Sequence, residues 1–224
     1  MELEKIRSIF EQLNAINEQI LSFSEDVFLA IDPRDNESLA KGSEFIQKFN
    51  IEADKFGQQV NRIEELLLSY FDKTAQDLRP AVEEGNDKQI NERLIRELDK
   101  NKAHTLHENF TYKRPYGFIL QGIAYRNLLT WKAIYLKVLS IVQEQNRDKF
   151  IEITTDPLFI SKRGNPSFST SPDVLRVAEK ISDEIYAEVN LSANSIRENL
   201  IDILSFFDIN PDQMQVYLRE DRDA

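Results

Sequence analysis

The chain has 224 residues, with 39 Asp and Glu against 28 Lys and Arg, a formal net charge of −11 and no cysteine. The length allows one large or two small domains, and a hydrophobic content of 41% with 14 Phe is too rich for a disordered chain. The lack of cysteine excludes a disulfide framework, a thiol nucleophile and the common structural zinc sites.

Residues 1–102 predict a helical, coiled-coil-like arm. In the first segment apolar residues recur at intervals built from threes and fours as far as Asp32, and these are Leu3, Ile6, Phe10, Leu13, Ile20 and Val27. Ser38 is the predicted N-cap of a second helix. The second segment has an unbroken heptad pattern from Ile46 onward, and a short amphipathic segment around Leu94 completes the arm. Because the apolar seam of such an arm is narrow, we expect a homodimer or a helical protein partner.

Residues 103–224 predict a compact α+β module. A hairpin is expected over residues 116–126, with Gln121 and Gly122 in its turn, followed at once by a largely buried helix. Short strands or loops, a strand at 185–189, a helix capped by Ser192 and a last strand at 214–218 follow. The fold class predicted for the whole chain is therefore α+β, with a long-helix arm before the compact module.

The second half also resembles a bacterial C-terminal module joined to nuclease, helicase or restriction-type genes in phage defence and DNA metabolism. The resemblance rests on Lys113-Arg114-Pro115, Phe118, Gly122, Tyr125 and Trp131, and on the segment from Asn190 to Ile196. It implies a bacterial setting in which the module binds nucleic acid or a defence partner. No catalytic residue is known for that module, so none is transferred to this chain.

The charge is distributed unevenly along the chain. Residues 1–102 contain 22 acids and 14 bases, whereas residues 103–224 contain 17 acids and 14 bases. No acid occurs between Glu108 and Glu144, nor between Pro157 and Pro172. Cations without carboxylate neighbours can form a phosphate-binding surface, and tyrosines and a tryptophan lie among them. The predicted nucleic-acid-binding residues are Lys113, Arg114, Arg126, Lys132, Lys162 and Arg163.

Ordinary explanations compete with this hypothesis. Solvated surface charges also account for these cations, since a chain of this acidity is a poor nonspecific DNA binder. Trp131 falls on the apolar face of its helix, as a core residue does. Ser192, Asn194 and Arg197 are a candidate anion site at a helix N-terminus, although helix capping alone explains Ser192.

The two histidines, His104 and His107, are three residues apart and would need acids from elsewhere to hold a metal, so no metal site is assigned. No glycine pattern typical of a nucleotide site occurs, and no cofactor is expected. Neither a secretion signal nor a membrane span is recognisable, which predicts a cytoplasmic protein.

These observations favour a binding or adaptor protein without catalytic activity. In this hypothesis the arm self-associates and the module presents its basic face to nucleic acid. Two alternatives remain open: an accessory subunit that binds only proteins through its long helices, and a metal-dependent hydrolase built on His104, His107 and nearby acids.

Overall fold

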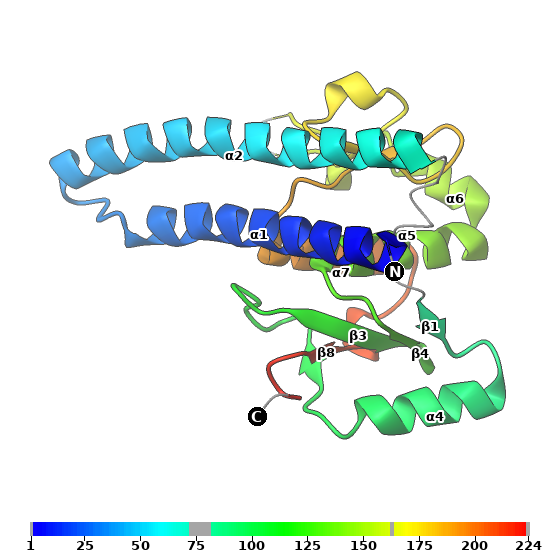
Figure 1. Ribbon diagram of the computed structural model, residues 1–224. Coiled ribbons are helices and arrows are strands. Elements are labelled where there is room, and N and C mark those ends of the chain that lie inside the picture. Colours follow the sequence, from blue (N-terminus) through cyan, green and yellow to red (C-terminus); the bar gives the residue numbers. More distant parts are fainter. Residues whose placement is uncertain (1, 72–81, 162–163, 223–224) are drawn as a thin grey trace.

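The computed structural model describes residues 2–71, 82–161 and 164–222. It shows two long antiparallel helices, here called the helical hairpin, and a compact domain of helices and antiparallel strands (Figure 1). The predicted α+β fold with a helical arm is confirmed. The hairpin consists of α1 (Glu2–Ala30) and α2 (Asn36–Phe71), and its turn projects beyond the domain.

The turn between the two helices is built from aspartate side chains. Asp32 accepts a hydrogen bond from the backbone N–H of Arg34 at 2.9 Å, and Asp35 accepts one from Glu37 at 3.0 Å. The second helix therefore begins at Asn36, with Asp35 as its cap. The predicted N-cap, Ser38, was wrong by about one turn, because the earlier Asp35 supplies the capping oxygen.

The main sheet has five antiparallel strands in the order β1-β4-β3-β8-β2. Its central hairpin pairs Leu120 with Ile123, and Gln121 and Gly122 both have positive φ, as a tight two-residue turn requires. This confirms the predicted hairpin. The strands are β1 (Glu83–Glu84), β2 (His104–Thr105), β3 (Pro115–Leu120), β4 (Ile123–Arg126) and β8 (Met214–Leu218).

One face of this sheet is covered by α4 (Lys88–Leu98), which begins at the capping residue Asp87. Leu94 and Leu98 are buried against three residues of the sheet, which are Ile119, Ala124 and Tyr217. The sequence pattern predicts this segment as part of the arm over residues 1–102. In the structure its apolar stripe contacts the sheet instead, because the sheet provides an apolar face of matching width.

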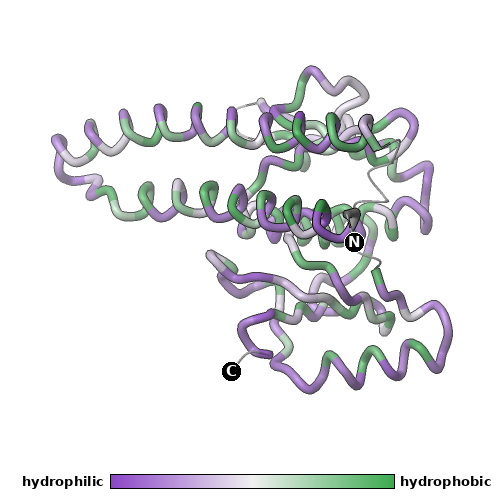
Figure 2. The backbone as a smooth tube through the Cα atoms, in the orientation of Figure 1, coloured by the Kyte–Doolittle hydropathy of each residue, from purple (hydrophilic) through white to green (hydrophobic). Residues whose placement is uncertain are grey.

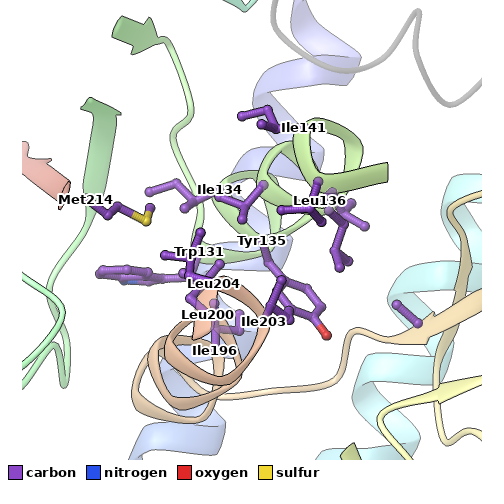
Figure 3. Close-up of a cluster of buried hydrophobic side chains, with 14 of the residues drawn as sticks. Trp131, Ile134, Tyr135, Leu136, Ile141, Ile196, Leu200, Ile203, Leu204 and Met214 are labelled. Carbon is purple, nitrogen blue, oxygen red and sulfur yellow. The ribbon is translucent and has the colours of Figure 1, made fainter. Parts of the chain in front are cut away.

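The main core lies between the other face of the sheet and two helices, α5 (Trp131–Gln145) and α7 (Ala193–Phe206). Side chains of both helices meet there, together with Met214 of β8 (Figure 3). Trp131 and Tyr135 are fully buried in this core. The predicted buried helix and the helix capped by Ser192 are both confirmed.

A smaller sheet, in the order β5-β7-β6, and several short helical turns complete the domain. Its middle strand matches the strand predicted at 185–189. These elements are α6 (Arg147–Glu152), β5 (Phe168–Ser169), β6 (Ala178–Lys180), β7 (Tyr186–Glu188) and the 3₁₀ turns Pro157–Phe159, Pro172–Val174 and Pro211–Gln213. Among the described residues, no helix is both long and apolar enough to cross a membrane.

The packing of α4 on the sheet leads to a stability prediction. Replacing the fully buried Leu98 with alanine should lower the free energy of unfolding by about 2–5 kcal/mol, because it removes apolar contacts and leaves a cavity. The exposed Ile90 on the same helix is the matched control, and its replacement with alanine should cost less than about 1 kcal/mol. Urea denaturation measures both; equal losses would show that α4 does not pack as described.

Candidate functional site

The cations predicted to bind nucleic acid are paired with carboxylates from distant parts of the chain. Arg126 lies between Glu83 and Glu97 and donates to both. Lys132 is 3.1 Å from Glu179. In a third pair Arg114 Nε donates to Glu220 at 2.9 Å. Their windows lack acids in sequence, but the fold brings acids to all three side chains.

The other predicted cations do not restore a basic cluster. Lys113 is exposed, and its side chain makes no ion pair with the described residues; Lys162 and Arg163 lie outside them. Trp131 is buried, and its indole N–H donates to the Lys113 carbonyl at 2.8 Å, so the ring is not available for stacking. Nucleic-acid binding stays a prediction, without a group of unpaired cations to support it in the described part of the chain.

The candidate anion site is filled by the protein itself. Ser192 caps α7 by accepting from Ser195 N–H at 3.1 Å, and its hydroxyl donates to the carboxylate of Glu25 in α1. Asn194 accepts from a backbone N–H at 2.9 Å, and Arg197 donates to a carbonyl at 3.2 Å. A glutamate from the hairpin thus lies where an external anion was expected.

Both histidines are also held by carboxylates. The ring nitrogens of the buried His104 lie 2.8 Å from Glu108 and 2.8 Å from Asp221. Hydrogen bonding to His104 lowers the pKa of Glu108. His107 is exposed and lies 2.9 Å from Asp212. Within residues 2–71, 82–161 and 164–222 no group of three His, Cys, Asp or Glu side chains could hold a metal ion.

The side of α1 that faces the domain carries glutamates at a spacing of seven residues. Glu11 accepts from Arg219, and Glu18 accepts from the backbone N–H of Lys132, at 2.9 Å, in the first turn of α5. Glu25 accepts from the hydroxyls at the start of α7. Glu18 and Glu25 thus satisfy donors at the N-termini of two domain helices, and Glu11 pairs with Arg219, so that these contacts hold the hairpin on the domain.

An amide cluster extends this polar contact to α2. Asn17 donates to the side-chain oxygen of Asn190 at 2.9 Å, and Asn190 donates to Asp54 at 2.8 Å. Gly57 allows the close approach, because a Cβ there would lie 2.5 Å from the same Asn190 oxygen. This inner face was not predicted from the sequence, although the regular spacing of Glu11, Glu18 and Glu25 is a visible signal.

The opposite side of the hairpin is apolar and open. From α1 it presents Ile9, Ile16 and Phe23, each seven residues from the next and 51%, 46% and 43% exposed. From α2, Ile63 is 41% exposed, and two more aromatic residues, Phe49 and Phe56, are partly exposed on the same stripe. Figure 2 shows apolar residues recurring along both long helices. We call these six residues the outer stripe.

Aromatic side chains gather where the outer stripe approaches the turn. The rings of Phe23 and Phe49 are 5.4 Å apart, and those of Phe45 and Phe49 are 5.6 Å apart. Phe28 and Leu29 are still more exposed at the end of α1. Exposed apolar side chains that form a continuous stripe, rather than scattered ones, are typical of a binding surface.

Comparison with known proteins adds no assignment, because no known protein family, curated protein or solved structure matches the chain. The site is therefore interpreted from its geometry alone.

The contact at Gly57 can be tested by adding one methyl group. Gly57→Ala should destabilise the protein by about 1–3 kcal/mol, since Asn190 is held by two hydrogen bonds and cannot move away. Gly42→Ala in the same helix is the control. Its new Cβ would lie 2.5 Å from Cγ1 and Cδ1 of Ile31, but this side chain is partly exposed and has room to shift toward solvent, and alanine favours the helix by up to about 1 kcal/mol. Thermal unfolding that ranks Gly57→Ala at or above Gly42→Ala in stability would contradict the described contact.

The buried Glu18 predicts a pH dependence. Burial raises its pKa from 4.5 to about 7, against the opposing effect of its hydrogen bonds to the first turn of α5 and of the charges of Lys132 and Arg219. Between these values the folded state binds a proton that the unfolded state does not. The contribution of Glu18 to the free energy of unfolding is therefore fully present below about pH 4.5. It is lost as the pH rises through about 7, and the loss is about 3 kcal/mol at most.

Denaturation of the wild type and of Glu18→Gln at a series of pH values measures this effect. The difference in unfolding free energy between the two proteins should change across this window and level off above it. Glu65→Gln, at an exposed acid of α2, is the control and should follow the wild type. A constant difference between wild type and Glu18→Gln from pH 4 to 8 would refute the assignment.

Proposed function

We propose that this protein is a protein-binding subunit and that the outer stripe of the helical hairpin is its binding surface. The observation that carries the proposal is the division of the hairpin into two unlike faces. Its inner face satisfies carboxylates and amides against the domain, whereas its outer face leaves six apolar side chains partly exposed.

The pattern of the outer stripe supports a helical partner. Residues spaced by seven on a helix form one side of a coiled-coil seam, and a seam of two antiparallel helices is completed by further helices that pack across it. An amphipathic helix recognised in such a groove contributes apolar residues at the same spacing. Among the two alternatives to nucleic-acid binding, this geometry favours the subunit that binds only proteins.

The distribution of charge supports the same conclusion. Acids of the hairpin that contact the domain, such as Glu11, Glu18 and Asp54, are directed away from the outer stripe. The stripe itself contains no charged residue. A phosphate backbone therefore finds no cation within it, while an apolar helix surface meets little desolvation cost there.

Site-specific photo-crosslinking in cells that make the protein tests the proposal. A photoreactive amino acid at Ile16 or Ile63 should give discrete protein adducts, because these side chains lie in the proposed interface. The matched control is Leu158 of the domain, which is 49% exposed and lies outside the hairpin. Adducts of equal yield from Leu158, or adducts that nuclease treatment removes, would count against a protein-binding outer stripe.

A further inference from the structure

We infer that the outer stripe binds the same stripe of a second copy of this chain, related by a two-fold axis that crosses the hairpin at the level of Ile16 and Phe56. This inference rests on the proposed function and specifies its partner. It follows from the register of the two helices, from the symmetry of the stripe and from its charge and size.

Contacts at two levels fix the register of the hairpin. Phe23 contacts Phe49, and near them Ser24 donates to Asn50 at 2.6 Å. About two helical turns further along, a Cβ on Gly57 would lie 3.4 Å from the side-chain oxygen of Asn17. Because the helices are antiparallel, a step of seven residues along one is matched by seven residues back along the other.

This register makes the outer stripe symmetric about its centre. Starting from the pair of Phe23 and Phe49, one heptad step places Ile16 level with Phe56, and the next places Ile9 level with Ile63. Each helix contributes three residues to the stripe. A two-fold axis through the middle level places the three residues of each helix against the same three residues of the second copy, in reverse order. Ile16 therefore faces Ile16 of the second copy, and Ile9 faces Phe23 of that copy. Such a surface is self-complementary, which a two-fold interface requires.

The charges near the stripe allow a second copy to approach despite the net charge of −11. The positions beside the stripe include uncharged Gln12, Gln19 and Gln59. Glu52, also beside it, is paired with Lys55 at 2.7 Å. Asp26 continues the series of Gln12 and Gln19, and it is hydrogen-bonded to Tyr112 of the domain. Two copies that meet here therefore bring few carboxylates close to one another.

The size of the face also fits a dimer. Exposed apolar side chains continue beyond the outer stripe to Phe45 and Tyr70, so the α2 side of this face is about 38 Å long at a rise of about 1.5 Å per residue. Two packed helices are about 20 Å wide, so the face covers on the order of 700 Å². A stable interface buries about 800 Å² on each partner, which is close to this value. Both domains then lie on the outside of a four-helix assembly, opposite the interface.

Cysteine cross-linking of the full chain tests the symmetry, because the natural sequence has no cysteine to interfere. Ile16→Cys should cross-link to itself under mild oxidation or with a short bis-maleimide reagent. A mixture of Ile9→Cys and Phe23→Cys should cross-link in pairs, whereas each alone should not. Leu29→Cys is the control: it is 77% exposed but lies beyond the stripe, and it should stay uncross-linked.

A charge exchange at the central position tests the energetics. Light scattering after gel filtration should give about twice the chain mass of 26.1 kDa for the wild type. Ile16→Glu should weaken the dimer at least about 100-fold, because two carboxylates then face each other. Ile16→Lys alone should do the same, and an equimolar mixture of the two variants should restore a dimer. Circular dichroism and thermal melting of each variant confirm that it remains folded.

The outcomes separate this inference from the proposed function. A monomeric wild type at tens of micromolar, or cross-linking of Leu29→Cys in preference to Ile16→Cys, overturns the inference. If the protein is monomeric and a photoreactive group at Ile16 still captures a different protein, the proposed function stands with another partner. If Ile16 gives neither dimer nor adducts, both fail.

Discussion

The structure depends on the interaction of carboxylates of α1 with the amino-terminal ends of α5 and α7. Glu18 and Glu25 lie one heptad apart on the same side of α1, and they satisfy N–H or hydroxyl groups that these ends expose. Both domain helices therefore point their positive ends at the hairpin. This polar contact determines which side of the hairpin is covered, and so it also determines that the apolar outer stripe remains open.

Local features of the fold were predictable from the sequence because local chemistry determines them. The turn at Gln121 and Gly122 needs positive φ, and the hydroxyl of Ser192 caps the helix that follows it. The heptad pattern of α2 also predicted its length and the stripe that contains Phe56 and Ile63. What α4 packs against was not predictable, since an amphipathic pattern shows that one side is buried but not by which partner.

The candidate site was harder to predict because it depends on contacts between distant residues. The cation windows were read from sequence neighbours, but the partners of Arg126 and Arg114 lie 29 to 106 positions away. In α1, the expected stripe included Phe10 and Leu13 and passed over Ile9 and Ile16. The outer stripe became recognisable only when the structure showed that the inner side of α1 is occupied by the domain.

The position of β8 has a consequence for how the chain folds during synthesis. This strand is made last among the described elements, yet it lies between β3 and β2 in the sheet, and Arg219, just after it, binds Glu11 of the first helix. The sheet cannot close, and α1 cannot make all its contacts, before these residues leave the ribosome. Until then, the inner side of α1 lacks its contact with Arg219 on the nascent chain, while the outer stripe is open. A chaperone that shields the first helix cotranslationally would therefore suit this topology.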